Sequence, residues 1–130
     1  MVVTTPKLSA ARILVIDDDR AVGRLLVARL AEEGYTVRSA LTSDEGLILV
    51  TSLHPDLVLL DLSLPDMSGL EVLKRIRATN PAIAVIVVTG NTDPQRARQA
   101  LELGALAYVD KPFDVAYLKR VVAMALLKGV

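Results

Sequence analysis

The chain has 130 residues but no cysteine, no tryptophan, one phenylalanine and one histidine. Because cysteine is absent, the protein forms no disulfide and has no thiolate for catalysis or metal binding. This composition is consistent with a cytoplasmic protein, and we expect that location. Aromatic residues make up only 3% of the sequence, whereas hydrophobic residues as a whole make up 52%. Leucine, valine, isoleucine and alanine must therefore build the core of a single domain of ordinary size.

Charge of one sign is not in excess, since 15 lysine and arginine residues balance 15 aspartate and glutamate residues. No field over the whole chain therefore favours nucleic acid or an anionic membrane. The sequence also lacks a basic run interleaved with aromatics and a glycine-rich phosphate loop, so we expect neither nucleic-acid binding nor nucleotide binding. The longest apolar run, residues 82–88, is too short to span a bilayer, and we expect no membrane association.

The first ten residues lack the long apolar stretch of a signal peptide. We therefore expect residues 1–10 to form a flexible leader and residues 11–130 to form one domain. No linker, internal repeat or low-complexity segment divides the second range. The sequence leaves open whether this domain stands alone or belongs to a longer protein with an output domain.

Five short apolar runs alternate along the chain with five segments of helical pattern. Runs of this length are typical of buried strands, which we predict at 12–16, 36–40, 57–60, 83–88 and 106–109. The helices are predicted at 20–33, 43–52, 68–79, 94–103 and 115–128, with Gly34 and Gly104 ending the first and the fourth. This alternation predicts right-handed crossovers and a parallel sheet covered on both faces. We expect a flavodoxin-like α/β fold, a (βα)5 three-layer sandwich with strand order 2-1-3-4-5.

Charged residues follow three of the predicted strands directly or almost directly. Asp17 and Asp18 follow the first strand, Asp61 follows the third, and Lys111 lies two residues after the fifth. The carboxyl ends of parallel strands meet at one edge of the sheet, where open α/β sheets bind their ligands. Three neighbouring carboxylates repel one another, so the pattern indicates a site for a hard divalent cation such as Mg²⁺.

Four motifs give the chain a specific resemblance to a known family. They are Ile13-Leu14-Val15-Ile16-Asp17-Asp18-Asp19, Asp61-Leu62-Ser63-Leu64-Pro65-Asp66-Met67-Ser68-Gly69, Val88-Thr89-Gly90 and Lys111-Pro112-Phe113. Each motif alone is weak, but all four occur in order and each lies at a strand end. Over residues 12–128 the chain resembles a response-regulator receiver domain, the phospho-acceptor module of two-component signalling.

The resemblance implies a role for each of the acidic residues. Asp61 would accept a phosphoryl group from a phosphohistidine on a histidine kinase or phosphotransfer protein, since a carboxylate needs an activated donor. Asp17, Asp18, Asp61 and the backbone carbonyl of Ser63 would hold Mg²⁺, with Asp18 as the direct ligand of the acidic pair. Asp19, the third acidic residue of the run, is better explained as the N-cap of the first helix.

Three further residues match the switching machinery of the family. Lys111 would bring a positive charge to the phosphoryl oxygens, and its peptide bond to Pro112 would be cis. The hydroxyl of Thr89 would donate a hydrogen bond to a phosphoryl oxygen. Tyr108 matches the aromatic residue that reorients when the threonine moves.

The resulting hypothesis is a phosphorylation-controlled module and not an enzyme, apart from its own phosphorylation and dephosphorylation. Phosphorylation would shift the face formed by the fourth helix, fifth strand and fifth helix, and so control an output domain or a partner. Two alternatives stay open. One is a small phosphatase or hydrolase that passes through an aspartyl phosphate, and the other is a receiver-like interaction domain that is not phosphorylated.

Several features have no chemical role in this hypothesis. Residues 121–127 are apolar on more than one face of the fifth helix, which indicates a homodimer or contact with another domain. Gly23 and Gly46 lie inside predicted helices at a cost of about 1 kcal/mol each relative to alanine, and the sequence offers no reason for either. We predict that His54, which precedes a proline in a turn, is exposed.

Overall fold

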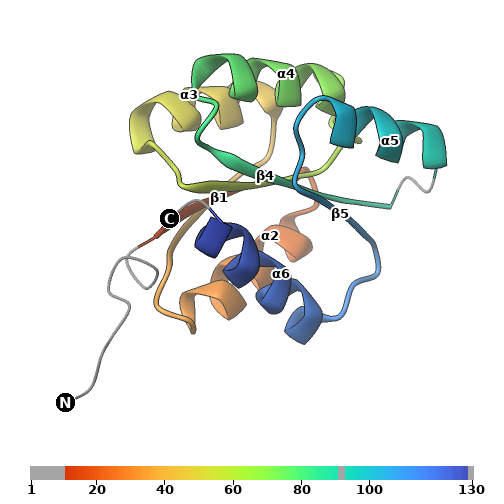
Figure 1. Ribbon diagram of the computed structural model, residues 1–130. Helices are drawn as coiled ribbons and strands as arrows, with labels where there is room; N and C mark the ends of the chain where they lie inside the picture. The colour runs from red at the N-terminus through yellow and green to blue at the C-terminus, as the bar shows by residue number, and fades with distance from the viewer. Residues whose placement is uncertain (1–10, 91–92, 129–130) are drawn as a thin grey trace.

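The computed structural model describes residues 11–90 and 93–128 as an α/β sandwich of three layers (Figure 1). The central sheet is parallel throughout and has the order β2-β1-β3-β4-β5. Its strands are β1 (Arg12–Ile16), β2 (Thr36–Ala40), β3 (Leu57–Leu60), β4 (Ala84–Thr89) and β5 (Ala107–Asp110). The predicted fold class and strand order are therefore confirmed. The leader predicted at 1–10 lies outside the described residues.

The described residues form five helices, which cover both faces of the sheet. They are α2 (Arg20–Ala31), α3 (Ser43–Leu53), α4 (Gly69–Thr79), α5 (Pro94–Glu102) and α6 (Val115–Lys128). In Figure 1, α3, α4 and α5 lie on one face, and α2 and α6 lie on the other. Within the described part of the chain, no helix is both long enough and apolar enough to cross a membrane.

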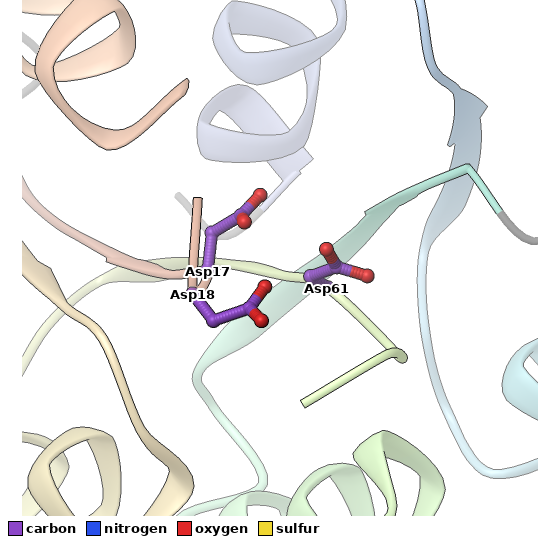
Figure 2. Close-up of side chains that lie close together, drawn as sticks. All are labelled: Asp17, Asp18 and Asp61. Carbon is purple, nitrogen blue, oxygen red and sulfur yellow. The ribbon is translucent and has the colours of Figure 1, made fainter. Parts of the chain in front are cut away.

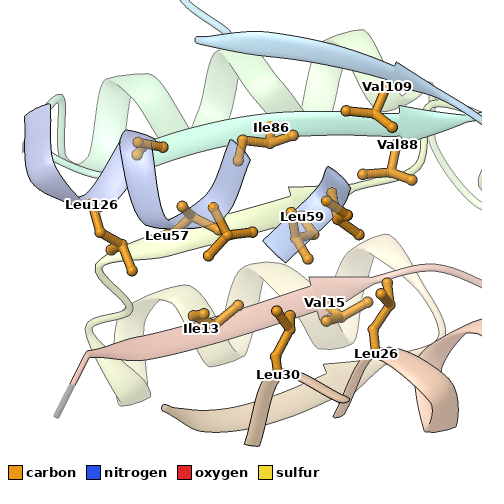
Figure 3. Close-up of a cluster of buried hydrophobic side chains, with 14 of the residues drawn as sticks. Ile13, Val15, Leu26, Leu30, Leu57, Leu59, Ile86, Val88, Val109 and Leu126 are labelled. Atoms are coloured by element: carbon orange, nitrogen blue, oxygen red, sulfur yellow. The ribbon is translucent and has the colours of Figure 1, made fainter. Parts of the chain in front are cut away.

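Each face of the sheet carries its own hydrophobic core, because successive strand residues point to opposite faces. Toward α2 and α6 the strands bury Ile13, Val15, Leu57, Leu59, Ile86 and Val88, which pack with Leu26, Leu30, Leu118, Val122 and Leu126 (Figure 3). Toward α3, α4 and α5 they bury Leu14, Ile16, Val58, Leu60, Val85 and Val87. A strand buried on both faces needs apolar residues throughout, which explains the uninterrupted runs in the sequence.

A few element boundaries differ from the predicted ones. β4 and β5 each begin and end one residue later, so that Thr89 and Asp110 belong to the sheet and pair in register. α2 ends at Ala31, two residues early, because the following residues leave the helix in a turn. The glycines predicted to end two of the helices lie shortly after α2 and α5, and both have a positive φ, 94° at Gly34 and 107° at Gly104.

Two residues that the sequence assigned to caps and turns occupy such positions. Asp19 is the N-cap of α2, because its carboxylate accepts the N–H groups of Ala21 and Val22 at 2.9 and 3.3 Å. His54 follows α3 with a φ of 51° and is exposed, as predicted. Neither side chain takes part in the chemistry described below.

The structure explains one of the two helical glycines. A Cβ atom at Gly46 would lie 2.6 Å from Cδ1 and 2.9 Å from Cγ1 of Ile16. Glycine therefore lets α3 approach β1 closely, at the residue that precedes the acidic pair. At Gly23 the atom nearest to an added Cβ would be the Cβ of Ser39 at 3.7 Å, which is an ordinary contact. Packing does not require glycine at that position.

The two glycines should respond to alanine in opposite directions. Gly23→Ala should raise the free energy of unfolding by about 0.5–1 kcal/mol, since alanine favours a helix and fits the space. Gly46→Ala should lower it by about 1–3 kcal/mol, since the added methyl group overpacks against Ile16. Urea denaturation followed by far-ultraviolet circular dichroism measures both changes. Stabilisation by both substitutions would contradict this account of how α3 packs.

Candidate functional site

Charged and hydroxyl side chains meet at the carboxyl edge of the sheet. Asp17 and Asp18 follow β1, Asp61 follows β3, Thr89 is the last residue of β4, and Lys111 follows β5. One carboxylate oxygen from each of the three aspartates lies within 4.8 Å of the others. Figure 2 shows these carboxylates gathered at the ends of β1 and β3. The structure thus brings together the residues that the sequence pattern had selected at separate strand ends.

The register of the sheet places Asp17 beside Asp61. Ile16 pairs with Leu60 in the parallel ladder between β1 and β3, and the N–H of Asp61 donates to the carbonyl of Ile16 at 2.9 Å. Because both strands are buried on both faces, the core fixes this register. The junction of β1 and β3 is the topological switch point of the fold, where open α/β sheets bind their ligands.

Lys111 is shared between two carboxylates. Its Nζ lies 2.7 Å from Oδ2 of Asp17 and 2.9 Å from Oδ2 of Asp61. Burial acts to lower the pKa of Lys111, but the hydrogen bonds and charges of the two carboxylates outweigh it and raise the pKa. Burial raises the pKa of Asp17, and the hydrogen bonds from Lys111 and from the N–H of Asp19 offset this only in part. Two carboxylates thus stabilise the charged form of Lys111, whereas Asp17 and Asp61 must share a single ammonium group.

The pocket keeps an excess of negative charge. Three carboxylates face one ammonium group, so two negative charges are left uncompensated within the described pocket. Asp17 already accepts the N–H of Asp19 through Oδ1 and the ammonium of Lys111 through Oδ2. Asp18 is exposed and has no hydrogen-bond partner within residues 11–90 and 93–128, so its carboxylate is freer to bind a cation directly. A donor set of carboxylate oxygens with this charge fits a hard divalent cation such as Mg²⁺.

Both carboxylate oxygens of Asp61 accept hydrogen bonds. Oδ1 accepts the hydroxyl of Thr89 at 2.8 Å and the N–H of Ser63 at 2.9 Å, while Oδ2 accepts the ammonium of Lys111. Asp61 is buried, and Thr89 is 0% exposed. The Lys111–Pro112 peptide bond is cis, as the resemblance implied. The arrangement fixes the orientation of one carboxylate and surrounds it with donors that stabilise negative charge on oxygen.

Tyr108 lies next to the pocket and is not part of it. In the ladder between β4 and β5, Val87 pairs with Tyr108 and Thr89 pairs with Asp110. Since alternate residues of a strand share a face, Tyr108 and Thr89 lie on the same face of neighbouring strands. Tyr108 is half-buried against the core beneath α3, α4 and α5. Burial, followed by the charge of Asp110, raises the pKa of Tyr108.

One side chain beside the pocket was not assigned a role from the sequence. Asp66 lies in the β3–α4 loop, and its carboxylate accepts the N–H and the hydroxyl of Ser43 and the N–H of Asp44. The hydrogen bond from the Ser43 hydroxyl, followed by that from the Ser43 N–H, lowers the pKa of Asp66 to about 2. These partners lie 23 and 22 residues earlier in the chain, so no local pattern could reveal the contact.

Comparisons with known proteins agree with this geometry. The family model described as the response regulator receiver domain matches residues 13–123. The chain is 37% identical over 115 residues to the regulatory protein AtoC of Escherichia coli (strain K12), a match that covers 88% of this chain and 25% of that protein. It is 38% identical over 104 residues to the sporulation initiation phosphotransferase F of Bacillus subtilis (strain 168), covering 80% of this chain and 84% of that protein.

The chain spans less than half of some other relatives. It is 40% identical to the transcriptional regulatory protein DltR of Streptococcus agalactiae serotype III (strain NEM316), and the match covers 79% of this chain but 46% of that protein. The similarity to this relative and to the Escherichia coli protein is therefore a similarity to one part of a longer chain.

Solved structures have the same fold. The response regulator receiver domain protein (CheY-like) from Methanospirillum hungatei JF-1 matches with a TM-score of 0.90 and 34% identity, over 92% of this chain and 96% of that chain. The BeF3-activated DrrB receiver domain matches with a TM-score of 0.83 and 32% identity, over 91% and 98%. With its acidic pocket at the β1–β3 junction and a family match over most of its length, the chain belongs to the response regulator receiver domain family of two-component signalling.

Proposed function

We propose that the chain accepts a phosphoryl group on Asp61 from a phosphohistidine of a histidine kinase or a phosphotransfer protein in the cytoplasm. The observation that carries this proposal is the set of donors around Asp61. The Lys111 ammonium and the Ser63 N–H reach its carboxylate at 2.9 Å, and the Thr89 hydroxyl reaches it at 2.8 Å. The name of the Bacillus subtilis relative, a phosphotransferase, supports the same chemistry.

The transfer forms one bond while another breaks. A carboxylate oxygen of Asp61 forms the new P–O bond, the P–N bond of the donor breaks, and the bonding electron pair stays on the imidazole nitrogen. Negative charge spreads over the phosphoryl oxygens during this step, and preorganised donors stabilise it. Lys111 and Thr89 are such donors, because both already contact the carboxylate that is modified.

Mg²⁺ is the cofactor that fits this pocket. Asp18 would bind it directly, while Asp17, Asp61 and the backbone carbonyl of Ser63 would supply further oxygen ligands. When bound, the ion neutralises charge on the transferring phosphoryl group. The reason for a divalent cation is the charge of the pocket, since Lys111 alone leaves two carboxylate charges uncompensated.

If Asp61 is the acceptor, labelling should depend on its carboxylate and on Mg²⁺. Incubation of the parent protein with acetyl phosphate and Mg²⁺ should add one phosphoryl group, detected by intact-protein mass spectrometry. Asp61→Asn should stay unmodified, and EDTA should suppress labelling of the parent. Asp56→Asn is the matched control, because Asp56 precedes β3 and lies at the opposite edge of the sheet. This variant should be labelled like the parent.

Each contrary result of the labelling experiment has a distinct meaning. Equal labelling of Asp61→Asn would show that the acceptor is another residue. A parent that takes up no phosphoryl group would favour the interaction domain that is not phosphorylated. Sustained turnover of an unrelated phosphoester would favour the aspartyl-phosphate hydrolase.

Thr89 is the residue through which we expect phosphorylation to reach the surface. Its hydroxyl would turn from Asp61 to a phosphoryl oxygen, and Tyr108 on the same face of β5 would respond. The hydrogen bond to a charged group is worth about 1.5–3 kcal/mol, enough to shift a two-state population about tenfold or more. The output would be a change in the face formed by α5, β5 and α6.

Thr89→Ala should therefore separate phosphorylation from its output. Treated with beryllofluoride and Mg²⁺, this variant should keep the NMR shift changes near Asp61 but lose most of those around Tyr108. Thr79→Ala is the control, because among the described residues the Thr79 hydroxyl donates only to the carbonyl of Arg75, within α4. A full response of the Tyr108 region in Thr89→Ala would mean that Thr89 does not transmit the change.

The α5–β5–α6 face exposes apolar side chains, as expected from the sequence of α6. Met124 is 63% exposed, and Leu106, Tyr117 and Leu127 are also exposed. Leu106, Met124 and their neighbours line a shallow hollow of about 170 Å³ between β5 and α6. We propose that this face contacts a second copy of the chain or a linked output domain.

Beryllofluoride should increase the dimer fraction if this face binds a second copy. Sedimentation velocity should then show more dimer in the treated parent protein than in the untreated one. Met124→Glu should abolish the increase, because a carboxylate would be buried in the interface. Ile48→Glu, on α3 and similarly exposed (67%), should leave the increase intact. A strict monomer with and without beryllofluoride would exclude the dimer and leave the output domain.

A further inference from the structure

The β3–α4 loop, which carries Ser63, is tied to a different helix by one side chain. Asp66 accepts the N–H of Ser43 at 3.0 Å and the Ser43 hydroxyl through Oδ1, and the N–H of Asp44 at 3.1 Å through Oδ2. Both N–H groups belong to the first turn of α3, where backbone donors lack helical partners and a negative charge is favoured. The contacts therefore join the β3–α4 loop to the start of α3, which lies more than 20 residues earlier in the chain.

The helix end that Asp66 contacts is itself joined to the acidic pair. The N–H of Asp17 donates to the carbonyl of Ala40, the last residue of β2, at 3.0 Å. Ser43 follows Ala40 by three residues. One side of the pocket, at Asp17, is thus connected through the β2–α3 loop and Asp66 to the other side, at Asp61 and Ser63.

The base of the β3–α4 loop is closed independently of Asp66. The N–H of Gly69 donates to the carbonyl of Leu62 at 3.1 Å, and a Cβ atom at Gly69 would lie 2.3 Å from the Cα of Leu62. Leu62 is also buried. Between these fixed points, Leu64 and Met67 pack half-buried against the core. Within the described residues, Asp66 supplies the side-chain hydrogen bonds that join this part of the loop to the start of α3.

We propose that Asp66 is a positioning residue for the Mg²⁺ site, because it holds the loop that presents the backbone carbonyl of Ser63. The inference rests on the proposed function, in which that carbonyl is a ligand. Without the hydrogen bonds of Asp66, which we call the brace, the loop could move away from Asp61. Binding of Mg²⁺ would then have to order the loop, and this entropic cost would weaken the binding. Since the pKa of Asp66 is about 2, its carboxylate stays ionised and keeps its three hydrogen bonds at any pH at which phosphorylation is measured.

A Mg²⁺ titration at a temperature well below unfolding tests the brace. The dissociation constant is read from the amide signals of Asp61 and Ser63 in ¹H–¹⁵N NMR spectra. Asp66→Ala should bind Mg²⁺ about three- to tenfold more weakly than the parent, somewhat less than the usual 10–100-fold effect of a residue that contacts a ligand. Asp66→Asn should be intermediate, since its amide keeps an acceptor for Ser43 but not for Asp44.

The control is Asp56→Ala. Asp56 also accepts a backbone N–H across the chain, that of Arg12 at 2.8 Å, but it lies at the opposite edge of the sheet. This variant should bind Mg²⁺ like the parent even if it is less stable. At saturating Mg²⁺, labelling of Asp66→Ala by acetyl phosphate should return to the parent rate, which general damage to the fold would not allow.

Asp18→Ala distinguishes failure of the brace from failure of the metal site. If the parent binds no Mg²⁺, or if Asp18→Ala binds it equally well, the proposed metal site is wrong. If Asp18→Ala binds weakly but Asp66→Ala matches the parent or Asp56→Ala, Asp66 has no positioning role. Should Asp66→Ala fail to fold, Asp66→Asn and Ser43→Ala decide the matter: binding weaker than that of Asp56→Ala supports the brace, and binding equal to it overturns the inference.

Discussion

The crowding of three carboxylates around one ammonium group is the interaction on which the site depends. Asp17 and Asp61 are buried, and buried charges are costly unless they are paired and hydrogen-bonded. Lys111, Thr89 and backbone N–H groups supply the hydrogen bonds, but one ammonium group cannot balance the charge. The buried carboxylates therefore have hydrogen-bond partners, but the pocket keeps a net negative charge. Such a pocket fits a divalent cation.

The two hydrophobic cores offset the cost of this pocket and hold its parts in place. β1, β3 and β4 are buried on both faces, so their register cannot slip without exposing apolar side chains. Each pocket residue lies at or just beyond a strand end, where that register determines its position. The loops need only short additional contacts, of which the one between Asp66 and the start of α3 is the clearest example.

Most elements could be predicted from hydrophobic periodicity, and the errors lie at the ends of elements. The bounds of β1, β2, β3 and α6 agree with the predicted ones. Charged residues mark three of these ends, since Asp17 follows β1, Asp61 follows β3 and α6 ends at Lys128. The ends of β4 and β5 were one residue off, since Thr89 and Asp110 are polar and join the sheet only by pairing with each other. A hydrogen bond between neighbouring strands cannot be predicted from the hydrophobic pattern of either strand alone.

The sequence by itself determined the fold class, the strand order and the acidic and basic residues of the pocket. The strands are recognisable as apolar runs, and the charged pocket residues follow such runs directly or almost directly. Only the tertiary structure decided how these groups share their hydrogen bonds. Lys111 bridges to Asp17 across 94 residues, Thr89 reaches Asp61 across 28, and Asp66 reaches Ser43 across 23. The close approach that requires glycine at position 46 is also a contact between α3 and β1. Local patterns report which face of an element is buried, whereas contacts between distant segments depend on how the elements pack.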